Sequence, residues 1–181
     1  MPDKKKHSVG ASRYVKYFCV SLLYLLSALI MFYPVAFHIS TLNGYSSSDL
    51  YQNLWNIWWV KYAVVNLHAS VFYTALLFWP IGSNLAFQTL VPLSGIVSIP
   101  FQLLGTSFAY NIIFLLGFVF SGLAMFILAD YLIKDILAAA IAGFAFTFSA
   151  FHITQSLFHM QYMLIGWAPL LLYFFLRLMK D

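Results

Sequence analysis

The sequence predicts an all-α integral membrane protein with four transmembrane helices, one re-entrant or interfacial apolar segment and an outer juxtamembrane amphipathic helix. Hydrophobic residues make up 63% of the 181 residues and charged residues only 8%, whereas soluble domains carry about 25% charged residues. The apolar residues also form runs long enough to cross a hydrocarbon core of about 30 Å. We therefore expect a multi-pass protein of the cell membrane that contacts membrane lipids and no nucleic acid.

The runs divide the chain into a cytoplasmic basic tail, residues 1–16, and a single membrane domain, residues 17–178. A first span over 17–38 is followed by a long outer loop, residues 39–107, and Pro34 is expected to bend or fray the outer end of this span. Three further apolar runs complete the predicted set of spans, at 108–131, 136–151 and 162–178.

The outer loop contains two predicted elements and an aromatic turn. An interfacial helix is expected over 49–65, and a turn signature follows at Trp79-Pro80-Ile81-Gly82. The apolar stretch 90–104 contains two prolines and a glycine and is short for a span. If it does not cross the membrane, eight of the nine basic residues fall on the cytoplasmic side, as the positive-inside rule favours. We therefore expect 90–104 to be re-entrant or interfacial and the N-terminus to be cytoplasmic.

Small residues recur four apart within the predicted spans. Ala139 and Gly143 form one such pair, and Gly117 and Ser121 form another. Pairs of this kind let neighbouring membrane helices approach closely. We interpret them as helix-packing positions.

One face of the predicted interfacial helix is polar. Asp49, Gln52, Asn53 and Asn56 recur at i, i+3, i+4 and i+7, and aromatic residues cover much of the remaining surface. Asp49 is the only carboxylate that the topology places outside. It is either an acid that stabilises a helix N-terminus or a general base or metal ligand.

A second polar face is expected at the outer end of the third span. His152, Gln155, Ser156 and His159 share the same spacing. These side chains could line a polar cavity or cap helix ends. The two histidines are about two helical turns apart, too far to hold one ion unaided, so no metal ligands are assigned.

Lys61 is the remaining outer cation. It is expected either to extend its amine towards the membrane surface or to contact a phosphate. The sequence contains no Walker loop, GxSxG, HExxH or CxxC motif. It also lacks paired charges within the spans, which disfavours a small-solute transporter.

The order of these features resembles the N-terminal part of the GT-C class of membrane glycosyltransferases. The matching segments are Asp49 followed by Trp55-Asn56-Ile57-Trp58-Trp59, then Pro80-Ile81-Gly82, Pro92-Leu93-Ser94-Gly95 and His159-Met160-Gln161. The resemblance covers nearly all of residues 17–178 through short, loose motifs. Many members have Gly-Asp at the start of this loop, where this chain has Ser48-Asp49, and members have more spans than this chain.

The resemblance implies transfer of a sugar from a lipid-phosphate donor at the outer membrane face. It implies that Asp49 is the catalytic carboxylate, and it leaves the cofactor unknown, with a divalent cation as one possibility. The candidate substrate-binding residues are Gln52, Asn53, Asn56, Lys61, His152, Gln155 and His159. The expected protein is an N-terminal portion or a short relative of such an enzyme, with the missing C-terminal portion as a possible partner. The alternative is a non-catalytic subunit of a larger integral membrane complex with other membrane subunits.

Overall fold

The computed structural model describes residues 4–41 and 48–180, most of them in helices. Residues 1–3 of the predicted tail and 42–47 of the predicted outer loop lie outside the described residues. The main helices are α1 (Lys4–Met31), α2 (Tyr33–Phe37), α3 (Ser48–Lys61), α4 (Pro92–Ser98), α5 (Thr106–Ile133), α6 (Ile136–Thr147), α7 (Ala150–Phe158) and α8 (Trp167–Leu178).

Three described segments are long and apolar enough to cross a membrane: Tyr14–Met31, Thr106–Ile133 and Met160–Leu178. Helices α6 and α7 add a fourth only if this pair, bent by 43°, is counted as one span. Four separate straight spans are therefore not established. The chain is nevertheless a mostly helical protein with several membrane-spanning candidates, as its composition predicts.

The first predicted span ends earlier than the apolar run that suggested it. Helix α1 begins within the basic tail at Lys4 and stops at Met31. Helix α2 starts at Tyr33 with Pro34 in its first turn, where a missing N–H is tolerated. The long helix is therefore interrupted just before Pro34, as the expected disturbance of its outer end predicts, and Pro34 lies in the first turn of a new short helix.

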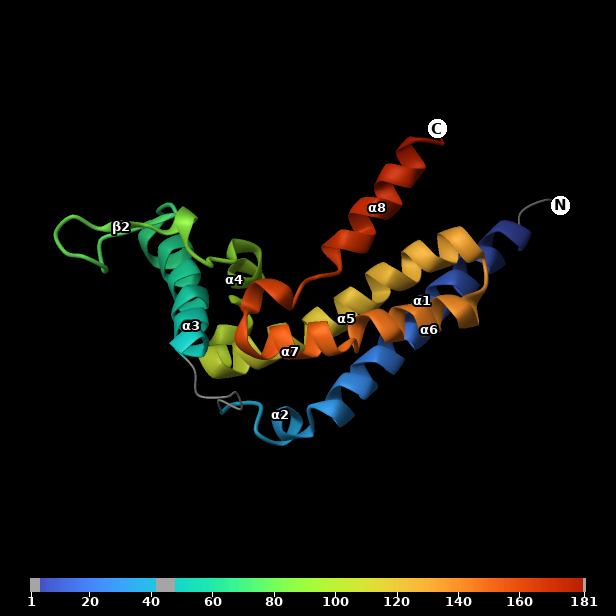
Figure 1. Ribbon diagram of the computed structural model, residues 1–181, viewed down its shortest axis with the longest axis horizontal. Coiled ribbons are helices and arrows are strands. Elements are labelled where there is room, and N and C mark those ends of the chain that lie inside the picture. The colour runs from blue at the N-terminus through green and yellow to red at the C-terminus, as the bar shows by residue number, and fades with distance from the viewer. Residues whose placement is uncertain (1–3, 42–47, 181) are drawn as a thin grey trace.

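Helices α1, α5 and α6 pack side by side along the long axis of the molecule (Figure 1). Gly122 of α5 and Gly143 of α6 contact the ring of Tyr24 of α1, which is fully buried. Its hydroxyl donates a hydrogen bond of 2.9 Å to the carbonyl of Ala140. Ala139 is fully buried in the same cluster, so the small residues of α6 serve the close packing that their spacing predicts.

A two-residue turn joins α5 to α6. Lys134 ends α5 in the left-handed conformation, with its N–H bonded to the carbonyl of Asp130. Asp135 then caps α6 by accepting a hydrogen bond of 2.7 Å from the N–H of Ala138. Aspartate is a favoured residue at this position, and the short connection makes the two helices antiparallel neighbours.

Helix α3 lies across one end of the long helices (Figure 1), which we call the α3 end. A π-helix, Tyr62–Leu67, continues α3. Beyond it, strands β1 (Tyr73–Thr74) and β2 (Ser83–Asn84) form a short antiparallel hairpin. The 3₁₀ turn Leu85–Phe87 then leads towards α4.

The stretch predicted to be re-entrant or interfacial contains α4 and the 3₁₀ helix Phe101–Leu104. Helix α4 has seven residues, too few to cross a bilayer. It packs closely on α3, because a Cβ atom added to Gly95 would lie 2.6 Å from Cβ of Val60. The side-chain amide of Gln102 donates hydrogen bonds to the carbonyl of Ile57, at 2.9 Å, and to Oγ of Ser98, at 2.8 Å.

Basic residues gather at the end of the molecule opposite α3. Tyr17, beside Lys16, packs edge-on against Phe126 near the C-terminal end of α5. Lys180 lies 4.7 Å from the centroid of the Tyr131 ring, and Lys134 occupies the turn between α5 and α6. The folded chain therefore brings residues from three distant parts of the sequence to one basic end.

Candidate functional site

The first residues of α3 meet the last residues of α7 at the α3 end. Oδ2 of Asp49 lies 3.3 Å from Nδ1 of His159, and both side chains are partly exposed, at 44% and 38% respectively. The rings of Phe158 and Tyr162 flank the imidazole, with centroids 6.5 Å and 5.9 Å from its own. A carboxylate paired with an imidazole at a partly open surface is a combination suited to accepting and holding a proton.

The position of each partner follows from local structure. Asp49 stands in the first turn of α3, where the helix dipole favours a negative charge. His159 is the C-cap of α7, in an extended conformation, and its backbone N–H bonds to the carbonyl of Gln155. The two predicted polar faces therefore meet through their end residues.

The amides of α3 connect the helix to neighbouring backbone. Asn53 is buried, and its Nδ2 donates to the carbonyl of Phe158 at 3.4 Å. Asn56 is also buried and donates to the carbonyl of Thr89 at 3.3 Å. These contacts attach α3 to the end of α7 and to the loop before α4.

Gln88 links Gln52 to Asn56, two of the three amides on this face. Its Nε2 donates to Oδ1 of Asn56 at 3.1 Å, and its Oε1 accepts from Nε2 of Gln52 at 2.9 Å. Gln88 was not among the predicted site residues. Its only sequence signal is a polar side chain in an apolar stretch, which does not reveal a partner about thirty residues away.

The second predicted polar face divides into an inner and an outer part. His152 is fully buried, stacks on Phe118 at 4.4 Å and places Nδ1 2.7 Å from the carbonyl of Thr147. Its Nε2 makes no hydrogen bond of good geometry, although backbone of Tyr162 and Met163 interacts with the ring. Gln155 is partly buried, and His159 lies beside Asp49.

Lys61 ends α3, twelve residues after Asp49. At 1.5 Å per residue the two backbone positions are roughly 18 Å apart along the helix axis. The structure therefore places Lys61 at the far end of α3 from the acid–imidazole pair.

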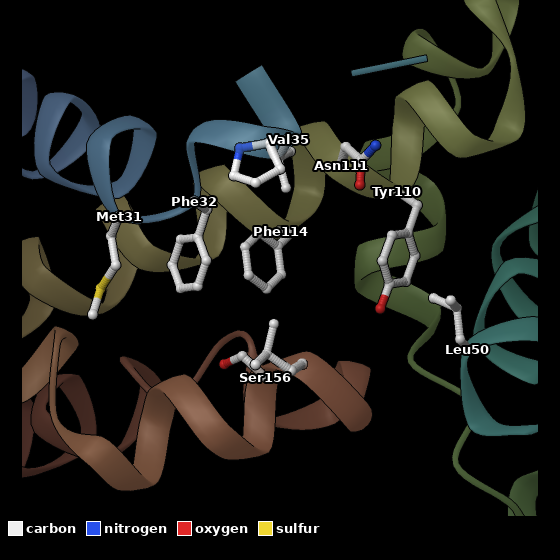
Figure 2. Close-up of a pocket in the computed structure, with 10 residues that line it drawn as sticks. Met31, Phe32, Val35, Leu50, Tyr110, Asn111, Phe114 and Ser156 are labelled. Carbon is white, nitrogen blue, oxygen red and sulfur yellow. The ribbon is translucent and has the colours of Figure 1, made fainter. Parts of the chain in front are cut away.

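A pocket of about 170 Å³ is lined by residues close in sequence to the pair, with Leu50 next to Asp49 and Ser156 three residues before His159 (Figure 2). Leu50 and Ser156 contribute to it from α3 and α7, and Tyr110 and Phe114 contribute from α5. The side chain of Ser156 is fully buried, and its Oγ has no hydrogen-bond partner within the described residues. Asn111 on the rim donates hydrogen bonds to the carbonyls of Ile39 and Thr41, at 2.9 Å and 3.0 Å.

Figure 2 shows how these walls are arranged. Met31 and Phe32 close one side, Leu50 and Tyr110 the other, and Ser156 lies across the space from Phe114. The lining is mainly apolar with a few polar atoms. Such a pocket can accept an apolar group and direct one hydroxyl or carbonyl of a ligand.

The same region offers few ligands for a metal ion. Over residues 4–41 and 48–180, no three His, Cys, Asp or Glu side chains come together. Asp49 and His159 would supply two protein ligands, whereas catalytic zinc sites use three.

No family model, curated protein or solved structure matches the chain.

Proposed function

We propose that this chain carries the reactive site of a GT-C-like membrane glycosyltransferase, with Asp49 as the general base. The pairing of Asp49 with His159 carries the proposal, because it joins a carboxylate to an orienting imidazole beside a mainly apolar pocket. The resemblance of the sequence to the N-terminal part of this class supplies the type of reaction. The donor would be a sugar linked to a lipid phosphate.

The orientation follows from charge. Lys16, Lys134 and Lys180 gather at the end opposite α3, and basic residues flanking spans favour the cytoplasmic side. The N-terminus is then cytoplasmic, and Asp49 and His159 face the outside of the cell membrane. A lipid-linked donor in the outer leaflet would approach them from within the plane of the membrane.

In the proposed reaction, Asp49 takes the proton from an acceptor hydroxyl. The oxygen of that hydroxyl forms a bond to the anomeric carbon of the sugar, and the bond from this carbon to the lipid phosphate breaks with its electron pair. His159 keeps the carboxylate oriented. General base catalysis of this type contributes roughly 10²–10⁴-fold to the rate.

The leaving phosphate needs positive charge or aligned donors. Lys61 is roughly 18 Å along α3 from Asp49, so we do not assign this role to it. The imidazole of His159 is a closer hydrogen-bonding group. Positive charge would come from a bound cation or from a partner chain.

The test is Asp49→Asn in the full-length gene, with glycan product measured in membranes supplied with a lipid-linked sugar. The change removes the base and keeps the side-chain shape, so transfer is expected to fall by roughly 10²–10⁴-fold. Asp135→Asn is the matched control, because Asp135 caps α6 at the opposite end and asparagine caps equally well. Unchanged transfer in Asp49→Asn would remove Asp49 from the mechanism and favour the non-catalytic subunit.

A further inference from the structure

The hairpin after the π-helix has a defined shape. Tyr73 pairs with Asn84 and Thr74 pairs with Ser83 across the two strands. The hydroxyl of Tyr73 also donates a hydrogen bond of 2.8 Å to the carbonyl of Ile81. Gly82 has a φ of +78° and lies under the Tyr73 ring, where no Cβ would fit. The tip of the hairpin, residues 75–82, is therefore held in place by its own side chains.

This tip exposes large apolar side chains. Phe78, Trp79 and Ile81 are 77%, 79% and 82% exposed, and Phe87 just beyond the hairpin is 92% exposed. The surrounding sequence contains no Asp, Glu, Lys or Arg between Lys61 and Asp130. A loop in bulk water normally carries polar and charged residues, so this composition indicates a different environment.

The hairpin packs against an aromatic cluster on α3, in which Trp59 is buried and Trp58 is 36% exposed. Trp55 stacks on Trp59 with centroids 5.8 Å apart, and Trp58 stacks on Tyr62 at 5.2 Å. The indole N–H of Trp59 donates a hydrogen bond of 2.9 Å to the carbonyl of Val71, at the base of the hairpin. Tryptophan and tyrosine are enriched where membrane proteins meet the headgroup region.

We propose that this hairpin is a lipid anchor that inserts Phe78, Trp79 and Ile81 into the interfacial region of the leaflet at the α3 end. A loop backbone with open N–H and C=O groups is excluded from the hydrocarbon core unless protein or water covers it. The interfacial region supplies water and headgroups for the backbone while the three side chains reach the acyl boundary. The proposal does not depend on glycosyl transfer.

A bilayer fits the tip better than a partner protein does. Protein interfaces combine an apolar centre with a polar rim and are enriched in arginine. The hairpin has no charged residue in its rim. The hydrogen bond from Trp59 to Val71 also connects the hairpin to α3, which lies across the end of the long helices.

Depth can be measured with a nitroxide attached to single cysteines in the protein reconstituted into phosphatidylcholine liposomes. Cys19 is exposed and is first replaced by serine. A nitroxide label is then attached at Phe78 in one variant and at Ile81 in another. For each label, the collision rate with oxygen, which partitions into lipid, is compared with the collision rate with a water-soluble nickel chelate. Leu116 on the lipid-exposed side of α5 and Lys134 in the α5–α6 turn are the apolar and aqueous references.

The expected oxygen-to-nickel ratio at both tip positions lies between those of Leu116 and Lys134. A ratio equal to that of Lys134 would mean that the tip is in water and would overturn the proposal. Low access to both reagents, with an immobilised label, would mean that protein covers the tip and would also overturn it. Labels at two exposed positions keep the test valid if one variant fails to fold.

Discussion

At the scale of single residues, the buried amides of α3 donate hydrogen bonds to backbone carbonyls at the end of α7 and in the loop before α4. Asn53 bonds to the end of α7, and Asn56 bonds to the loop that precedes α4. A carbonyl without a partner is costly in an apolar interior. These two side chains therefore stabilise the packing of α3 against α7 and against the loop before α4.

Replacing Asn56 with alanine is expected to destabilise the fold. The change removes two partly buried hydrogen bonds, from Asn56 to the carbonyl of Thr89 and from Gln88 to Asn56, and each such bond contributes about 0.5–1.5 kcal/mol. Thermal unfolding in detergent would show a lower midpoint. Gln52→Ala is the control, because Gln52 is exposed and water can replace its bond to Gln88. Equal midpoints for both variants, with reduced glycan transfer by Asn56→Ala, would indicate substrate binding instead.

The sequence predicted which residues are polar neighbours along a helix, but not where each side chain points. The i, i+3, i+4, i+7 spacing placed His152 and His159 on one face. In the structure α7 ends at Phe158, so His159 turns away as a cap while His152 is buried against Phe118. The pairing of Asp49 with His159 depends on packing between segments 110 residues apart, which helical periodicity cannot encode.

At the scale of elements, the spacing between α5 and α6 depends on Gly143. A Cβ atom at this position would lie 2.6 Å from the carbonyl oxygen of Gly122 and also overlap Tyr24. A backbone oxygen cannot move away as a flexible side chain can. The helices would have to separate to accept even one methyl group.

Gly143→Ala should therefore lower stability, by about 1–3 kcal/mol for overpacking. Helix propensity alone predicts the opposite sign, since alanine is favoured over glycine by about 1 kcal/mol within a helix. The sign of the shift in the unfolding midpoint shows whether overpacking or helix propensity dominates. Ile141→Ala is the matched control, because Ile141 is 60% exposed on the same helix. A more stable Gly143→Ala protein would contradict the close packing.

Element types were easier to predict from the sequence than element ends. The long apolar run at 108–131 lies within α5, because a span of this length leaves little choice of structure. The exact position of the break, at Phe32, and the short strands around residues 75–82 were not predicted. Both depend on local backbone geometry, such as the contact of Tyr73 with Gly82, which composition does not reveal.

At the scale of the whole molecule, basic residues are concentrated at the end opposite α3. Lys16, Lys134 and Lys180 lie at one end, and Asp49 lies at the other. In the orientation proposed above, the positive-inside rule places the basic end on the cytoplasmic side. The sequence predicts this orientation only on the assumption that residues 90–104 do not cross the membrane. Helix α4, with seven residues, is consistent with that assumption.

A cysteine at position 134 tests the orientation in intact cells. In a protein with Cys19 replaced by serine, a membrane-impermeant maleimide is expected to label position 134 only after the membrane is permeabilised. A cysteine at Ser70, exposed near the α3 end, is the control and should be labelled without permeabilisation. Labelling of position 134 in intact cells would place the basic end outside.

The buried Tyr24 has a consequence for the order of synthesis. Its hydrogen-bond acceptor, Ala140, is made 116 residues later. At about 5–20 residues per second, this corresponds to roughly 6–23 s of translation. During that interval α1 is already available for insertion, yet the glycines that will enclose its tyrosine have not emerged from the ribosome. Helix α1 therefore lacks these packing partners until α5 and α6 have been synthesised. Its final packing is completed late, although α1 is synthesised first.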